Sequence, residues 1–147
     1  MADPRVVEWL KVYPEPKTTA SYTEADEVLT LLKTTPETIA IIDLRNDRDP
    51  GYLKESVHIP AITLTDPKKI REEAIDLVKE AKPTAETIIV HCNSSKQRAV
   101  KVAGTIQDYL DQNNVPDLKV TVLKGGIAGW LPLDEPYKSF VIPTLEA

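Results

Sequence analysis

The stretch that decides the fold spans residues 88–98 and reads Ile88-Ile89-Val90-His91-Cys92-Asn93-Ser94-Ser95-Lys96-Gln97-Arg98. The β-branched apolar run at its start predicts a buried strand, and the small and polar residues after it predict a tight loop. Beyond Arg98, apolar residues recur with helical spacing, so we expect a helix to begin there. A loop that leads into a helix N-terminus offers backbone N–H groups and a positive dipole end to an anion.

Length and composition predict one globular domain. The chain has 147 residues, 41% hydrophobic and 28% charged, which suits a single core. The net charge of −5 comes from interspersed acidic and basic residues, so we expect neither a nucleic-acid nor a membrane partner. The single cysteine cannot form an internal disulfide, and neither a membrane-spanning run nor a signal-peptide pattern is evident. These features predict a cytoplasmic protein, and a nuclear location stays open.

Apolar patterns along the rest of the chain alternate between strands and helices. A compact apolar run predicts a buried strand at residues 39–42, and further strands are expected at 57–60, 87–90 and 119–123. Helical spacing predicts helices from Thr23, as the N-cap, to Pro36, from Pro67 to Pro83, and from 99 to 113. This alternation implies βαβ units with right-handed crossovers. We therefore expect an α/β fold, with a mostly parallel sheet of about five strands and helices on both faces.

Four short motifs follow one another along the chain. They are Asp43-Leu44-Arg45, residues 51–60, His91-Cys92 and Leu123-Lys124-Gly125-Gly126-Ile127-Ala128-Gly129-Trp130. Each motif alone is weak, but together they resemble the rhodanese-like domain superfamily. The resemblance implies a single rhodanese-like catalytic domain over residues 21–133. Residues 1–20 are then expected to form an N-terminal leader packed on the domain, and residues 134–147 a C-terminal tail.

The length of the central loop favours one branch of this superfamily. Residues 92–98 span seven positions and end in arginine, whereas sulfurtransferases of this fold usually have a loop one residue shorter. The longer form is similar to the cell-division-cycle dual-specificity phosphatases and to the eukaryotic, fungal-type arsenate reductases. Ser95-Lys96, Arg98 and Lys101-Val102-Ala103 resemble the arsenate reductases in particular.

The residue types in the loop suit a tetrahedral oxyanion. Cys92 would attack the central atom as a thiolate, which the loop amides, the helix dipole and Arg98 all favour. The Arg98 guanidinium adds two parallel donors that match phosphate or arsenate. We therefore assign catalytic roles to Cys92 and Arg98. The residues expected to bind the oxyanion are Asn93, Ser94, Ser95, Lys96, Gln97 and Arg98.

Three further residues are assigned supporting roles. His91 is expected to pack or hydrogen-bond behind the loop and to tune Cys92. Asp43 could approach the site as an acid, although the favoured interpretation is structural, with its carboxylate bound to loop amides or to Arg45. Two separated histidines and one cysteine make poor metal ligands. We expect neither a metal nor a bound cofactor.

The favoured function is arsenate reduction. Because the chain has a single cysteine, the second thiol must come from glutathione or a glutaredoxin. The first alternative is a phosphotyrosine or dual-specificity phosphatase acting on a phosphoprotein, but the loop offers no clear general acid. Gln97 stands where the phosphatase loop has a glutamate. A rhodanese-type sulfurtransferase carrying a Cys92 persulfide and a non-catalytic binding module also stay open.

Overall fold

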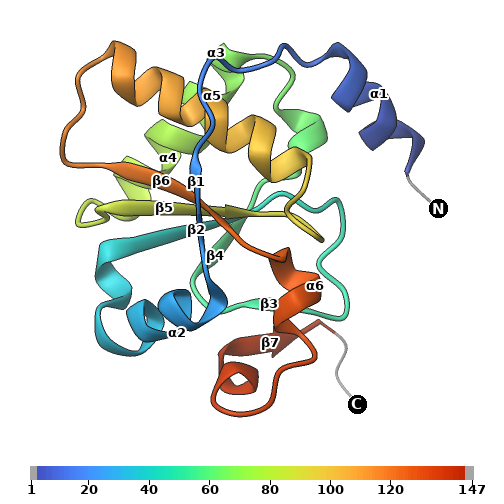
Figure 1. Ribbon diagram of the computed structural model, residues 1–147, viewed down its shortest axis with the longest axis vertical. Coiled ribbons are helices and arrows are strands. Elements are labelled where there is room, and N and C mark those ends of the chain that lie inside the picture. The colour runs from blue at the N-terminus through green and yellow to red at the C-terminus, as the bar shows by residue number, and fades with distance from the viewer. Residues whose placement is uncertain (1–2, 145–147) are drawn as a thin grey trace.

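The computed structural model describes residues 3–144 and is built on a parallel five-stranded sheet (Figure 1). The strands are β1 (Ser21–Thr23), β2 (Ile39–Asp43), β4 (Ser56–His58), β5 (Thr87–His91) and β6 (Lys119–Leu123). Their order across the sheet is β1-β6-β5-β2-β4, and every neighbouring pair is parallel. The predicted α/β fold with a parallel sheet is confirmed.

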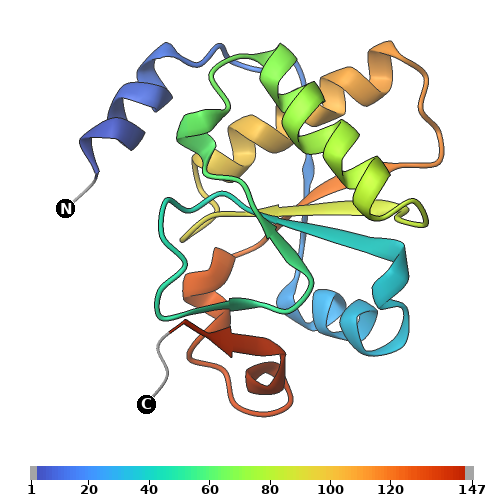
Figure 2. The ribbon, with the colours of Figure 1, turned by 180° about the vertical axis from the view of Figure 1, so that it is seen from behind.

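Helices cover both faces of the sheet (Figures 1 and 2). On one face lie α2 (Ala25–Thr34) and α6 (Gly126–Trp130). On the other lie α1 (Pro4–Val12), α3 (Pro67–Ile70), the π-helical turn η3 (Arg71–Ile75), α4 (Asp76–Ala81) and α5 (Arg98–Gln112). Short 3₁₀ turns occur at η1 (Pro36–Thr38), η2 (Ala61–Thr63) and η4 (Tyr137–Phe140).

Strand β2 shows why its apolar run does not alternate with polar residues. Successive side chains of a strand point to opposite faces, and both faces of this sheet are covered. Ile39 and Ile41 pack in the cluster below the sheet with Trp130, whereas Ala40 and Ile42 pack in the cluster on the α5 side. All five residues of β2 are buried, as expected for an inner strand of a parallel sheet.

A second, two-stranded sheet was not predicted. Its strands, β3 (Gly51–Leu53) and β7 (Val141–Pro143), pair antiparallel. The strand predicted at 57–60 is β4, which begins one residue earlier and ends two residues earlier. The prediction of Thr23 as a helix N-cap is wrong. Thr23 ends β1, and its hydroxyl lies 2.6 Å from the Thr121 hydroxyl across the sheet.

The segment before β1 packs along α5. Trp9 Nε1 donates to Leu64 O (2.8 Å), and the Tyr13 hydroxyl donates to Thr105 Oγ1 (3.0 Å). The Cβ of any larger residue at position 104 would lie 2.6 Å from Thr18 O, so Gly104 lets the two chain segments touch. The predicted leader (1–20) and tail (134–147) extend at residues 1–2 and 145–147 beyond the described part of the chain. Their division from the domain stays a prediction.

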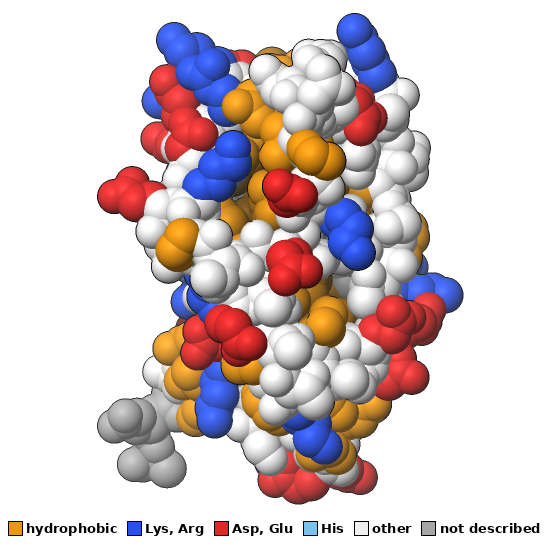
Figure 3. Space-filling model, turned by 90° about the vertical axis from the view of Figure 1, so that its left-hand side faces the viewer, with side chains coloured by type: hydrophobic (Ala, Val, Ile, Leu, Met, Phe, Trp, Pro, Cys, Tyr) orange, Lys and Arg blue, Asp and Glu red, His pale blue; other side chains and the backbone are white. Residues whose placement is uncertain are grey.

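The surface carries charges of both signs. Figure 3 shows the face where β5 and β6 begin, with acidic and basic side chains interspersed around small hydrophobic areas. This face is opposite the edge at which the parallel strands end. Across residues 3–144, no helix is long and apolar enough to cross a membrane.

Candidate active site

The loop of residues 92–98 joins the end of β5 to the start of α5, at the sheet edge where α/β folds bind ligands. Cys92 is the first residue after β5 and is only 2% exposed. Arg98 is the first residue of α5, a helix of 15 residues. The Gln97 side chain makes no capping hydrogen bond at this helix start, so the first backbone amides of α5 keep their capacity to bind an anion.

Ser95 shapes the loop from inside. It is buried, with a left-handed φ of 59°, and its Oγ accepts a hydrogen bond from the Cys92 amide (3.3 Å). Its carbonyl accepts a longer bond from the Tyr22 hydroxyl of β1 (3.4 Å). Ser95 therefore ties the middle of the loop both to its first residue and to a neighbouring strand.

The start of α6 supports the loop from the other side. The Ile127 and Ala128 amides donate to the carbonyls of Cys92 (3.2 Å) and Asn93 (2.9 Å). Gly126 has a φ of 60°, and a Cβ placed there would lie 2.3 Å from Asn93 O. Only glycine fits this position without moving the backbone that carries Cys92.

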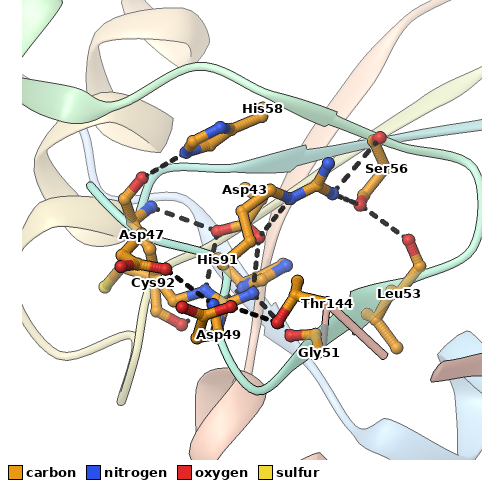
Figure 4. Close-up of polar contacts among 12 residues, drawn as sticks. Asp43, Asp47, Asp49, Gly51, Leu53, Ser56, His58, His91, Cys92 and Thr144 are labelled. Atoms are coloured by element: carbon orange, nitrogen blue, oxygen red, sulfur yellow. Dashed lines mark hydrogen bonds and ion pairs between the residues drawn. The ribbon is translucent and has the colours of Figure 1, made fainter. Parts of the chain in front are cut away.

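A buried ionic cluster lies beside the loop, at the end of β2 (Figure 4). The Asp43 carboxylate accepts hydrogen bonds from Arg45 Nε (3.0 Å) and Nη2 (2.7 Å) and from the Arg45 amide (3.1 Å). Arg45 Nη2 also donates to Gly51 O (2.9 Å), and Arg48 Nε donates to Asp43 (3.3 Å). Burial alone would raise the pKa of the Asp43 carboxyl, but the hydrogen bonds from Arg45 hold that pKa below its ordinary value. The Asp43 carboxyl is therefore ionised and bound to Arg45, and its supporting role stays a prediction.

His91 lies directly behind Cys92 and pairs with Asp43 across the sheet. Its Nδ1 lies 3.1 Å from Cys92 O, which places the proton of the neutral ring on Nδ1. Burial lowers the pKa of this imidazole, so the ring is neutral near pH 7. Its Nε2 has no hydrogen-bond partner among the described residues. His91 thus contacts the backbone of the loop rather than its solvent-facing side.

The remaining loop side chains are uncommitted. Asn93, Lys96 and Gln97 are exposed, and Ser94 and Arg98 are half-buried. Within residues 3–144, none of these five side chains makes a hydrogen bond or an ion pair with the protein. The structure brings all predicted site residues to one end of the sheet. Asp43, Arg45, His91, Cys92 and Ser95 are buried there, and the other loop residues are exposed or half-buried.

Comparison with known proteins identifies the fold family. The family model for the rhodanese-like domain matches residues 24–132. The chain belongs to the rhodanese-like domain family. No curated protein sequence matches it closely enough to be counted as a relative.

Solved structures similar to this rhodanese-like domain include two enzymes by name. One is the As-Sb reductase of Leishmania major, 24% identical, covering 86% of this chain and 88% of that chain, with a TM-score of 0.72. Another is Ygr203w, described as a yeast protein tyrosine phosphatase of the Rhodanese family. It is 24% identical, the match covers 87% of this chain and 95% of that chain, and the TM-score is 0.69. At this identity the likeness supports the shared fold, and the predicted family is confirmed.

Sequence reasoning missed three contributors to this rhodanese-like site. Arg48 sits in a polar stretch without periodicity, so nothing marked it as a partner of Asp43. The role of Tyr22 depends on the pairing of β1 with β6, which its short polar sequence did not indicate. The Gly125-Gly126 pair has positive φ values of 80° and 60°, and the contact of Gly126 with the loop was not foreseen. Among residues 3–144, no cluster of His, Cys, Asp and Glu could hold a metal ion.

Proposed function

We propose that this protein is a cysteine-thiolate enzyme that acts on a tetrahedral oxyanion, with arsenate as substrate and an external thiol as reductant. The observation that carries the proposal is the loop of residues 92–98. It holds the only cysteine at the base of a helix N-terminus and leaves Arg98 and the neighbouring polar side chains free for a ligand.

The reduction follows from the chemistry of one cysteine. The Cys92 thiolate attacks arsenic, a sulfur–arsenic bond forms, and an arsenate oxygen leaves as water after protonation from solvent. A glutathione thiolate then attacks the Cys92 sulfur, and the electron pair of the sulfur–arsenic bond reduces As(V) to As(III), which leaves as arsenite. The resulting mixed disulfide is reduced by a second thiol, from glutathione or a glutaredoxin, and Cys92 returns to its thiolate form. No cofactor or metal is needed.

The names of the similar structures support two branches of this proposal. The Leishmania major protein is named a reductase of arsenic and antimony, and the yeast protein a tyrosine phosphatase. Either activity in this chain would use Cys92 against an oxyanion. The reductase is the better fit, because a phosphatase must protonate an ester leaving group. The nearest carboxylate on β2, that of Asp43, is bound to two arginines.

Phosphatase activity on a phosphoprotein is the second candidate, because a phosphate ester is also a tetrahedral oxyanion that the free donors of Arg98 can bind. For the reductase, the cytoplasm or nucleus is the fitting compartment, since glutathione keeps thiols reduced there.

A parallel assay tests the proposal. Purified protein is given arsenate, glutathione, glutaredoxin and glutathione reductase, and NADPH oxidation is followed. The same preparation is assayed for hydrolysis of p-nitrophenyl phosphate and for sulfur transfer from thiosulfate to cyanide. Arsenate-dependent turnover that needs the added thiols is expected. Strong ester hydrolysis without arsenate turnover would assign the site to phosphatases instead.

The variant Cys92→Ser tests the nucleophile. Turnover should fall by at least about a thousandfold, because the covalent intermediate cannot form. Binding of arsenate or sulfate, measured by calorimetry, should persist because the loop amides and Arg98 remain. If turnover survives the substitution, Cys92 is not the nucleophile.

A further inference from the structure

A groove of about 610 Å³ lies beside the end of the edge strand β4. One wall consists of His58, Ile59 and Pro60, which follow β4 in the chain. The other wall is the helical stretch formed by η3 and α4. The volume falls within the range of sites that bind small ligands or a few side chains of a partner.

Each wall of the groove contributes an apolar side chain. Ile59, on the wall that follows β4, is buried, while Leu77 on the helix wall is 39% exposed. Leu77 is one of only four large hydrophobic side chains exposed within residues 3–144. An exposed apolar side chain surrounded by polar residues is a usual feature of protein contact sites.

Every charged side chain of the helix wall is acidic. Glu72, Glu73, Asp76 and Glu80 line the groove, and no lysine or arginine does. Glu72, Asp76 and Glu80 follow one another at i,i+4 spacing, at which like charges repel on a helix.

Cations of the protein itself do little to balance these carboxylates. Glu73 and Glu72 have only loose ion pairs of 3.8 Å with Lys69 and Arg71. Asp76 and Glu80 have no ion pair in the described part of the chain. A cation from a partner would relieve the repulsion, so the charge of the groove selects a basic ligand.

The groove is close to the candidate active site. His58 pairs with Asp43 on β2, and Asp43 pairs with His91 on β5. Two strand spacings separate His58 from His91, which is about 10 Å. A chain segment of a few residues can span that distance, so a ligand in the groove could extend to the loop of residues 92–98.

We propose that this groove docks a basic segment of a partner protein, with an apolar side chain on Ile59 and Leu77 and lysine or arginine side chains against Asp76 and Glu80. The bound segment brings the partner's reacting group beside Cys92. Docking itself does not depend on which reaction occurs at Cys92, so it can be measured without turnover.

Fluorescence anisotropy with two labelled peptides tests the docking site on the full chain. One peptide alternates arginine and leucine, and the other replaces each arginine with glutamate. The basic peptide should bind at least about tenfold more tightly, and added salt should weaken its binding. Equal binding of both peptides, or binding that salt does not weaken, would contradict the proposed recognition.

Two double variants with the same change in net charge locate the binding. Asp76→Lys with Glu80→Lys should weaken binding of the basic peptide by at least about tenfold. Glu86→Lys with Asp117→Lys alters two exposed acids at the opposite end of the strands and should change binding by less than about twofold. Equal losses in the two variants would mean that overall charge, and not the groove, attracts the peptide.

The variant Leu77→Ala tests the apolar contact without changing charge and should weaken binding severalfold. Urea unfolding of each variant shows that the fold persists.

Sedimentation without peptide should show a monomer. A dimer abolished by Asp76→Lys with Glu80→Lys would assign the groove to a second copy of the chain and overturn the proposal. Arsenate turnover by the same variants tests the proposed function separately, since the small substrate needs no docking.

Discussion

Two neighbouring strand ends in this protein use their polar groups in opposite ways. At the end of β2, the charges of Asp43 and Arg45 are buried and bound to each other and to the backbone. At the end of β5, the loop leaves Lys96, Gln97 and Arg98 without partners in the described chain. Buried charges are costly unless paired, whereas uncommitted ones can serve a ligand. The first strand end therefore stabilises the fold, and the second keeps donors available for the substrate of the proposed reaction.

The largest effect is expected at the buried strand end. Asp43→Asn removes the charge that balances Arg45, and the free energy of unfolding should fall by about 3–5 kcal/mol. Urea unfolding followed by circular dichroism measures this loss. The matched control is Asp47→Asn in the same loop, where the exposed side chain should change stability by less than about 0.5 kcal/mol. Equal effects would remove the distinction between the two strand ends.

Arg98→Lys should show the reverse pattern. It retains a positive charge but loses the paired donors, so kcat/KM for the oxyanion should fall by about a hundredfold. Stability should stay within about 0.5 kcal/mol because Arg98 makes no ion pair within residues 3–144. The same substitution at the exposed Arg71 serves as the control and should leave turnover unchanged. A large loss of stability in Arg98→Lys would show that Arg98 stabilises the fold.

Gly126→Ala tests the contact between the two regions, because residue 126 lies against the backbone of the loop that carries Cys92. The added Cβ meets Asn93 O at a positive φ, and stability should fall by about 1–3 kcal/mol with a parallel loss of turnover. Gly129→Ala is the control within the same short helix, since its Cβ would meet nothing within 4 Å. A loss confined to Gly129→Ala would contradict the contact seen at Gly126.

The smallest effect concerns pH. Because burial depresses the pKa of folded His91, the unfolded chain binds a proton below about pH 6.5 that the folded chain does not. Stability should therefore fall as the pH drops from about 7 to 5, by at most about 1.4 kcal/mol per pH unit from this group. Thermal unfolding of His91→Gln across this range should show a flatter dependence. Asp43 affects the pH dependence of stability in a more acidic range. The stability that its carboxylate contributes is lost only as the pH falls through the depressed pKa of the folded state.

The central strands and the loop could be predicted because their sequence carries its own signal. The run at 39–42 is apolar throughout, and the runs at 87–90 and 119–123 are mostly apolar; both faces of these strands are covered. The helix after Arg98 keeps its apolar spacing as far as Leu110. Apolar runs and helical spacing involve residues that are close together in the chain, so the sequence alone is enough to recognise them.

The missed elements depend on distant partners. Strand β3 exists because residues 51–53 meet residues 141–143, about ninety positions later, and three residues are too few to show a period. Thr23 looked like a helix cap because threonine is a good one, but its place beside Leu123 in the sheet decided its conformation. The contact of Gly126 with the loop likewise requires the folded arrangement of β5 and β6.

The packing of the N-terminal segment bears on where this domain can be cut. The family match begins at residue 24, yet Trp9 and Tyr13 belong to the same buried cluster as Ile106 of α5. A chain shortened to that boundary would uncover the apolar side of α5 and remove the hydroxyl that bonds Thr105. The stretch that the family model matches is therefore shorter than the stretch that packs around this buried cluster.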